Sequence, residues 1–396
     1  MKIAVLLPYK ENFSPEYPGA VSLFINDTCR LSKYGKNIKV YGNTEYKKLF
    51  KIKYQNINLT KQLVGSQTKL YINKFINFER KQPSDLIEIH NRPIYLKYLL
   101  ARLNKRTYTL FFHNDPLSME GSKSIKDRNF LLNNCYRIIF NSNWSKNRFL
   151  EGLGSKYLNS EKLKVFFQSA AKGNLKYLNN KKKWITFVGK LNKAKGYDIF
   201  GQAVIKILNK NKDWAAKVVG DEKREKINFN HNRIDKLGFI NHQKVLSLYR
   251  KSSIAVVCSR WEEPFGRTSL EASANGCAVI ISNRGGLPET VTNSLILQKL
   301  TVNELYKKIN TLIKNNNYRK KLQNLSIKNF FLTHKYVSSL IDDYREEKIG
   351  KVNKFNIIKK PRALRILHVT NFNERLDGRL FFNTGRRINN GFIRLG

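Results

Sequence analysis

Short, uninterrupted apolar runs alternate with helix-like stretches along most of this chain, and this alternation limits the possible fold more than any other feature. The runs lack the polar–apolar alternation of a half-exposed strand, so they indicate strands that are covered on both faces. Strand followed by helix, repeated many times, is typical of parallel sheets in α/β proteins. The predicted strands are 3–7, 38–41, 86–89, 110–112, 138–141, 165–167, 184–188, 217–219, 254–258 and 278–282, and the helix-like stretches include 22–34, 197–208, 243–251 and 266–275.

The alternation is interrupted once, by a polar and lysine-rich segment over 168–183. A segment without an apolar period is typical of a linker between domains. We therefore predict a first domain over 1–167, a second over 168–335 and a closing helix over 336–349. Residues 350–396 again read as a strand, a polar loop and a helix, like the start of the chain. We interpret them either as the truncated start of a second copy or as an unrelated extension.

The chain is strongly basic, with 74 Lys and Arg against 29 Asp and Glu and a net charge of +45. Such a charge attracts anions, including nucleic acid, anionic lipid and nucleotide substrates. A general bias toward Lys, Asn and Ile explains the charge equally well, because the lysines are spread along the whole length. The aromatic residues fall mostly in the apolar runs and no nucleic-acid-binding module is visible, so nucleic-acid binding is the weaker alternative.

The four cysteines, Cys29, Cys135, Cys258 and Cys277, form no C-x-x-C pair and have no histidine at metal-ligand spacing. They read as core thiols of a protein in a reducing compartment. No apolar run reaches the ~18 residues that a membrane span needs. We therefore expect a cytoplasmic protein.

The strongest local signal lies in residues 259–291. A predicted buried strand ends in a polar loop, and a helix begins near Arg267 and ends at Asn275, before Gly276. In parallel sheets ligands bind at the carboxyl ends of strands, and a helix N-terminus there favours phosphate. Glu263 and Glu271 flank the turn and could each accept hydrogen bonds from adjacent sugar hydroxyls. The alternatives are a helix cap for Glu263 and a solvated surface carboxylate for Glu271.

These residues also carry a resemblance. Glu263 and Glu271 are separated by seven residues and are followed by Gly276-Cys-Ala-Val-Ile and Gly285-Gly286-Leu-Pro-Glu. This pattern resembles the Glu–x7–Glu element of family 4 glycosyltransferases (glycosyl transferases group 1), especially bacterial enzymes of lipopolysaccharide and envelope polysaccharide synthesis. The resemblance covers roughly residues 1–345. It implies a GT-B fold, in which two Rossmann-like domains face a central cleft. It also implies a retaining, metal-independent transferase.

The resemblance implies roles for individual residues of the second domain. Glu271 would bind the ribose of the nucleotide and Glu263 the hydroxyls of the donor sugar. Lys190 and Lys195 match the family's Gly-Arg-Leu…Lys-Gly segment and would stabilise the leaving diphosphate. Lys190 replaces the common Arg and lacks its bidentate geometry; the alternative for both lysines is an ordinary surface position. The remaining residues of the predicted donor site are Phe265, Gly266, Arg267, Gly19 and Gly189.

The first domain matches the family less closely. His113 falls where the family places a histidine beside the donor sugar, where it could donate a hydrogen bond or assist proton transfer. His90 and Arg92 follow a neighbouring strand and would line the acceptor side. The alternative for both histidines is a strand-end imidazole satisfied by backbone. Gly19 stands in a loop where many members have Gly-Gly, and it could still permit close backbone approach.

Several patterns are absent. The chain contains no Asp-x-Asp, P-loop or dinucleotide fingerprint. We therefore expect no metal and no cofactor. The expected partners are a nucleotide-sugar donor and a saccharide or lipid-linked saccharide acceptor. Family members often dock on anionic membranes, and the basic amphipathic stretch 144–153 would place this chain at the inner face of the cell membrane. The alternative function is a GT-B protein that binds ligands without transferring sugar.

Overall fold

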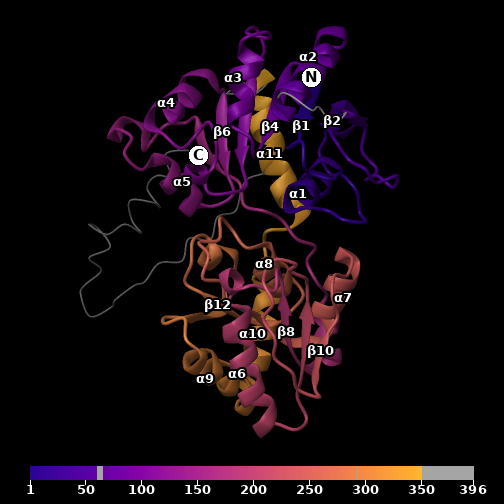
Figure 1. Cartoon of the computed structure of the whole chain (residues 1–396), viewed down its shortest axis with the longest axis vertical. Coiled ribbons are helices and arrows are strands. Elements are labelled where there is room, and N and C mark those ends of the chain that lie inside the picture. Colours follow the sequence, from indigo (N-terminus) through magenta and orange to yellow (C-terminus); the bar gives the residue numbers. More distant parts are fainter. Residues whose placement is uncertain (60–65, 292, 350–396) are drawn as a thin grey trace, which may run out of the picture. The chain divides into compact units, whose positions relative to one another are not determined.

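The structure is a computed structural model that describes residues 1–59, 66–291 and 293–349. Residues Met1–Arg345 form one compact unit, and of the second unit, Glu346–Gly396, only the end of the last helix is described. The predicted second-copy segment 350–396 therefore lies outside the described residues. The compact unit holds two parallel sheets, each covered by helices on both faces (Figure 1).

The first sheet has seven parallel strands in the order β3-β2-β1-β4-β5-β6-β7. Its central strands are almost entirely buried, as their continuous apolar sequences predict. The strands are β1 (Ile3–Leu6), β2 (Ile38–Gly42), β3 (Tyr54–Asn56), β4 (Leu86–His90), β5 (Tyr108–Phe112), β6 (Arg137–Phe140) and β7 (Leu163–Val165). The helices are α1 (Ala20–Cys29), α2 (Gln67–Lys81), α3 (Ile94–Leu100), α4 (Ile125–Asn134) and α5 (Asn143–Leu150).

The second sheet has six parallel strands in the order β10-β9-β8-β11-β12-β13. Both sheets have the order expected of doubly wound folds, whose ligands bind at the carboxyl ends of the strands. The strands are β8 (Lys182–Val188), β9 (Ala215–Val219), β10 (Ile234–Lys236), β11 (Ser252–Val257), β12 (Ala278–Ser282) and β13 (Ser294–Leu297). The helices are α6 (Tyr197–Lys210), α7 (His242–Lys251), α8 (Arg267–Ala274), α9 (Val302–Lys314) and α10 (Asn316–Lys328).

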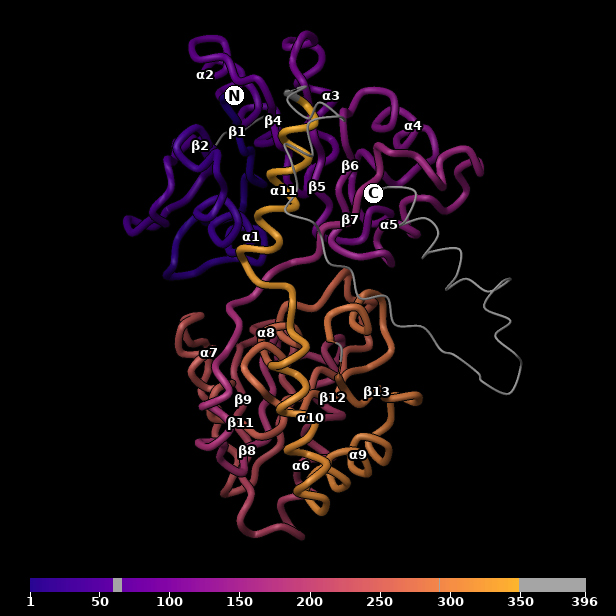
Figure 2. Tube along the Cα trace, turned by 180° about the vertical axis from the view of Figure 1, so that it is seen from behind, coloured from indigo at the N-terminus to yellow at the C-terminus, as the bar shows by residue number. Residues whose placement is uncertain are grey.

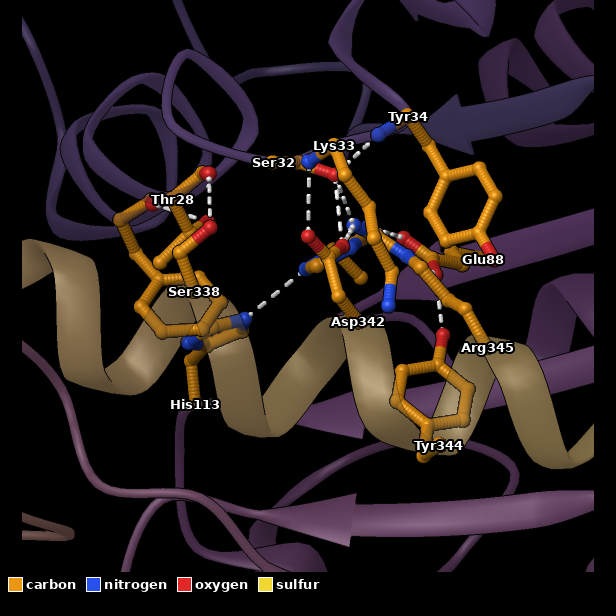
Figure 3. A network of polar contacts seen from close by, with 12 residues as sticks. Thr28, Ser32, Lys33, Tyr34, Glu88, His113, Ser338, Asp342, Tyr344 and Arg345 are labelled. Carbon is orange, nitrogen blue, oxygen red and sulfur yellow. Dashed lines mark hydrogen bonds and ion pairs between the residues drawn. The ribbon is translucent and has the colours of Figure 1, made fainter. Parts of the chain in front are cut away.

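The last helix, α11 (His334–Ile349), follows the second sheet in sequence but packs on the first (Figure 2). Val337, Ile341 and Tyr344 share a hydrophobic core with β1 residues. Arg345 forms a buried bidentate ion pair with Glu88 of β4, at 2.8 Å from Nε to Oε1 and 2.7 Å from Nη2 to Oε2. Figure 3 shows this network, in which Tyr344 also donates to Glu88. The chain thus returns to its first lobe before the described residues end.

The expected elements and the observed ones differ in identifiable places. The strand predicted at 165–167 lies at Leu163–Val165, because Phe167 instead stacks on Phe265 between the lobes. The strands β3, β10 and β13 were not predicted, since they are half-exposed edge strands and two of them are polar. The helix predicted over 22–34 ends earlier, at Cys29. The predicted linker 168–183 contains a short 3-10 helix and the first residues of β8.

Candidate donor site

A cavity of about 200 Å³ lies where the carboxyl ends of the strands of both sheets meet the N-terminus of α8. Residues from the first lobe, such as His113 and Asn141, line it together with residues from the second. Of the predicted site residues, the structure places at this cavity His113, Gly189, Lys195, Glu263, Phe265, Gly266 and Arg267. It does not place Glu271, Lys190, Gly19, His90 and Arg92 in the lining.

Glu263 lies in the loop that follows β11 and is 8% exposed. Its carboxylate forms an ion pair with Lys195 Nζ at the cavity. Its carbonyl accepts a hydrogen bond from Gly286 N at 2.6 Å. A Cβ on Gly285, whose φ is +57°, would lie 2.2 Å from that carbonyl oxygen, which explains a glycine there. Glu263 makes no cap of α8, since Gly266 is the N-cap residue and the helix has no side-chain cap.

The N-terminus of α8 therefore faces the cavity with its first N–H groups uncapped by a side chain. This end carries the positive pole of the helix dipole, which suits an anionic ligand. Gly266 has a φ of +118°, and a Cβ there would come within 2.4 Å of Leu287 Cδ2. The helix ends at Ala274 with Asn275 as its C-cap, as the sequence predicts.

Glu271 is buried one turn further along α8 and is 4% exposed. Its Oε1 accepts hydrogen bonds from Arg267 Nε at 2.6 Å and from His242 Nε2 at 2.8 Å. Burial alone would raise the pKa of Glu271, but Arg267 and His242 lower it to about 2. The alternative of a solvated surface residue is therefore wrong. Both of these hydrogen bonds go to Oε1, and none to Oε2 is observed within the described part of the chain, which leaves one carboxylate oxygen for a ligand.

Arg267 also reaches the first lobe. Its Nη2 lies 2.6 Å from Oδ2 of Asp27 in α1, so one guanidinium joins Glu271 to Asp27. The side chain of Arg267 is only 10% exposed. Neither His242 nor Asp27 stands in a motif, and no sequence pattern indicated that they meet at this arginine.

The two predicted lysines have different environments. Lys195 ends a 3-10 helix whose first turn is capped by Asn192, and Gly196 follows with a φ of +72°. A Cβ on Gly196 would lie 1.9 Å from the carbonyl oxygen of Cys258, directly after β11, so close packing requires a glycine there. Lys190 is exposed, lies outside the cavity lining and makes no ion pair among the described residues. The structure does not bring Lys190 to the site.

The two predicted histidines lie together. His113 is 7% exposed and its Nε2 is 3.0 Å from His90 Nδ1. His90 is 2% exposed and stacks on Phe111, so it contacts His113 rather than an acceptor. Burial lowers the pKa of His90 to about 3 and that of His113 well below its usual range. Both imidazoles are therefore neutral at pH 7, and one donates its N–H to the other.

Two asparagines that the sequence analysis missed hold this part of the cavity. Asn91 has a left-handed φ of +56°, and its Oδ1 accepts hydrogen bonds from His113 N at 3.1 Å and Asn114 N at 3.0 Å. Asn141 Nδ2 donates to the carbonyl of His113 at 3.0 Å. Both asparagines directly follow a strand. Asparagine tolerates left-handed backbone, so this position is a sequence signal for a residue that shapes the strand end.

Gly19 and Arg92 both lie outside the cavity lining. A Cβ on Gly19 would lie 2.2 Å from Glu11 Oε1, and this oxygen accepts a hydrogen bond from Ser22 N in the first turn of α1. Gly19 thus makes room for the half-buried carboxylate of Glu11. Arg92 is partly exposed and donates from Nη1 to the carbonyl of Asn91 at 3.1 Å.

The His90–His113 pair predicts a pH dependence of stability. The unfolded chain takes up protons on both residues below pH 6.5, whereas the folded pair does not until far lower pH. The stabilisation is complete above pH 6.5 and is lost as the pH falls toward 3, by about 1.4 kcal/mol per pH unit for each histidine. Denaturation between pH 7.5 and 5 should give a shallower slope for His90→Asn than for wild type; equal slopes would contradict the buried neutral pair.

Among the described residues no helix is long and apolar enough to cross a membrane, and no group of three or more His, Cys, Asp or Glu residues could hold a metal ion. The four cysteines are free thiols and all are buried, as predicted.

The chain is similar to known proteins over part of its length. Residues 174–328 match the profile of the family described as "Glycosyl transferases group 1". The chain is 33% identical over 224 residues to the uncharacterized glycosyltransferase MJ1178 of Methanocaldococcus jannaschii, covering 52% of this chain and 60% of that protein. It is 31% identical over 125 residues to the lipopolysaccharide core biosynthesis mannosyltransferase LpsB of Rhizobium meliloti, covering 29% and 35%. The chain thus spans about a third to three fifths of the length of these relatives.

The fold also matches solved structures. Alr3699/HepE of Anabaena, crystallised in complex with UDP and glucose, aligns over 89% of this chain and all of its own length, with a TM-score of 0.67 and 19% identity. The chain therefore has the GT-B fold of two Rossmann-like lobes. The prediction of the fold is confirmed, and the match to the glycosyl transferases group 1 family covers residues 174–328.

Proposed function

We propose that this protein is a retaining, metal-independent glycosyltransferase. It would move a sugar from a nucleoside diphosphate to an envelope saccharide or lipid-linked acceptor. The observation that carries this proposal is the arrangement around α8. The uncapped N-terminus of α8 and the Glu263–Lys195 pair border a single cavity, and Glu271 lies one turn further along the same helix.

The nucleotide would bind along this line. Oε2 of Glu271 accepts the ribose hydroxyls, while Arg267 and His242 keep the carboxylate ionised and oriented. The diphosphate lies at the N-terminus of α8, beside Lys195. Positive charge placed where the leaving diphosphate develops negative charge lowers the barrier to breaking the glycosidic bond. Lys195 and the helix dipole supply that charge from the protein itself, which supports transfer without a metal.

For a retaining enzyme, the scarcity of carboxylates at the cavity favours a front-face route over double displacement. Among the described lining residues Glu263 is the only carboxylate, and it is paired with Lys195. A double-displacement route would need a carboxylate nucleophile free to attack the sugar. A front-face route needs only leaving-group stabilisation and an acceptor on the same side. Glu263 would orient the sugar hydroxyls, and His113 would contact the sugar from the first lobe.

The acceptor class rests on the likeness to the lipopolysaccharide mannosyltransferase and on the first-lobe residues. Arg92, partly exposed after β4, remains the candidate for the acceptor side. Contact with an anionic membrane through 144–153 stays a prediction. In α5 Phe149 and Leu150 are buried in the core, so partly exposed residues such as Trp144 and Lys146 would be available there.

A thermal-shift panel of UDP, GDP, ADP, TDP and CMP in EDTA tests the donor site. One nucleoside diphosphate should raise the melting temperature of wild type by mass action. Lys195→Met should lower the affinity for that nucleoside diphosphate at least tenfold, or by about 1.4 kcal/mol, because the variant loses a charged contact to the phosphate. Lys193→Met is the matched control, since Lys193 lies in the same 3-10 helix but outside the cavity. Equal affinities in both variants would contradict the role of Lys195, and no shift in wild type would contradict the donor site.

A further inference from the structure

The Gly285-Gly286-Leu-Pro-Glu segment of the second lobe contacts the first lobe at the beginning of α5. Glu289 accepts a hydrogen bond on Oε2 from Asn143 N at 2.7 Å and on Oε1 from Trp144 N at 2.8 Å. It also accepts one from Asn143 Nδ2 at 2.8 Å. Asn143 and Trp144 are the first residues of α5, whose N–H groups have no partner within the helix. A carboxylate of one lobe therefore caps a helix of the other.

The loop that holds Glu263, residues 262–266 (the sugar loop), is fixed at the same place. Ser142, the N-cap residue of α5, donates from Oγ to the carbonyl of Pro264 at 2.5 Å, and Ser145 Oγ lies 3.3 Å from the same oxygen. A Cβ on Gly286 would come within 2.6 Å of this carbonyl oxygen and 2.9 Å of Ser142 Cβ. The lobes thus touch too closely here for any side chain at Gly286.

This contact continues into the cavity from both sides. Asn141 precedes the cap residue, lines the cavity and binds the carbonyl of His113. Pro264 follows Glu263 and lines the cavity as well. The proposed nucleotide contacts of Glu271 and Lys195 belong to the second lobe alone, whereas the sugar contacts of Glu263 and His113 come from different lobes. The placing of Glu263 opposite His113 therefore depends directly on this junction.

We propose that Glu289 is a positioning residue of the transfer reaction: by capping α5 from the opposite lobe, it holds the sugar loop against the first lobe and brings Glu263 and His113 together. This inference rests on the proposed function. It predicts different effects on turnover of the sugar nucleotide and on affinity for the nucleoside diphosphate. Loss of the cap should impair use of the sugar nucleotide while leaving affinity for the nucleoside diphosphate unchanged, and it should admit water, so that a larger share of the donor is hydrolysed.

Hydrogen exchange tests the contact without any ligand. In Glu289→Gln, the amides at the start of α5 should exchange about tenfold faster than in wild type, because the amide group cannot accept both N–H groups. Glu304→Gln is the matched control. Glu304 also accepts hydrogen bonds from two consecutive backbone N–H groups, those of Gln298 and Lys299, but within the second lobe. Glu304→Gln should leave the exchange rates of the α5 amides unchanged.

Kinetics test the consequence, with UDP-glucose, GDP-mannose and ADP-glucose as donors and the most active of them used for all variants. Glu289→Gln should lower kcat/KM about tenfold and raise the fraction of donor lost to hydrolysis, with the dissociation constant of the corresponding nucleoside diphosphate within twofold of wild type. Ser142→Ala, which removes the hydroxyl that holds Pro264, should act in the same direction if Glu289→Gln folds poorly. Glu304→Gln should match wild type.

Three outcomes would overturn the inference: unchanged exchange at α5, unchanged kcat/KM in both junction variants, or a nucleoside diphosphate affinity that falls in parallel with turnover. The last would make Glu289 a donor contact or a general stability residue. Failure of the proposed function looks different, because wild type itself would then bind no nucleoside diphosphate and consume no donor, and the catalytic role given to Glu289 would fall with it.

Discussion

Replacing Glu271 by alanine is expected to abolish stabilisation by the nucleoside diphosphate and to lower kcat/KM by roughly two orders of magnitude. Hydrogen bonds from ribose hydroxyls to a charged carboxylate are each worth about 1.5–3 kcal/mol, and about 1.4 kcal/mol corresponds to tenfold. The substitution also removes the partner of Arg267 Nε and of His242. Melting temperature with and without nucleotide, together with steady-state kinetics, measures both effects.

Asp27→Asn separates the ligand contact from the ion-pair network. It weakens the other contact of Arg267, to Asp27 Oδ2, while leaving Glu271 in place. Nucleotide affinity should remain within about threefold of wild type in this variant. If Asp27→Asn lost nucleotide binding as completely as Glu271→Ala, the effect at Glu271 would be structural and its assignment to the ribose would be wrong.

Replacing Arg345 by methionine should be the most destabilising single change of the first lobe, at about 3–5 kcal/mol. It leaves Glu88, which is 1% exposed, as a buried carboxylate without a cation. The double variant Glu88→Leu/Arg345→Met should recover most of the loss, because it removes both charges from the interior. Urea unfolding, followed by a probe of the first lobe, measures the difference.

One outcome of the double-mutant comparison would contradict the role given to the unpaired carboxylate. If Arg345→Met and the double variant were equally unstable, the cost would come from lost packing of α11 or from its contacts with Asp342 and Ser32, rather than from the unpaired carboxylate.

The central strands and the donor helix could be predicted because their sequences reflect local physics. Strands buried on both faces of a parallel sheet must be continuously apolar, and β12 lies at the expected residues, Ala278–Ser282. The bounds of α8 follow from a glycine on each side with left-handed backbone, Gly266 and Gly276. Glu263 lines the cavity from the loop before α8, whereas Glu271 lies within α8, one turn beyond Arg267.

Partners distant in sequence could not be predicted in the same way. Lys181 stands in what reads as a polar linker, yet its Nζ donates to the carbonyls of Tyr249 and Asn275, each at 2.8 Å, at the ends of α7 and α8. Burial lowers the pKa of this lysine. Nothing in its neighbours in sequence distinguishes it from the solvated lysines around it. The same holds for Arg345, whose partner in β4 lies 257 residues away.

The candidate donor site contains residues whose placement the sequence predicts and residues whose placement it does not. Lys195 and Lys190 have similar sequence surroundings, but only Lys195 reaches the cavity, because the turn at Gly196 packs against Cys258. His90 and His113 both end buried strands, and their direct contact follows from the adjacent positions of β4 and β5 in the sheet. Strand order, which the sequence does not state, decides which strand-end residues meet.

Consumption of sugar nucleotides in EDTA tests the central claim most directly. Purified wild type would be incubated with UDP-, GDP-, ADP- and TDP-sugars, and release of the nucleoside diphosphate would be followed beside Glu263→Gln and Lys195→Met. Wild type should consume one donor class without added metal, and both variants should lose most of that activity. Consumption of no donor, or of a donor only after a divalent metal is restored, would contradict it.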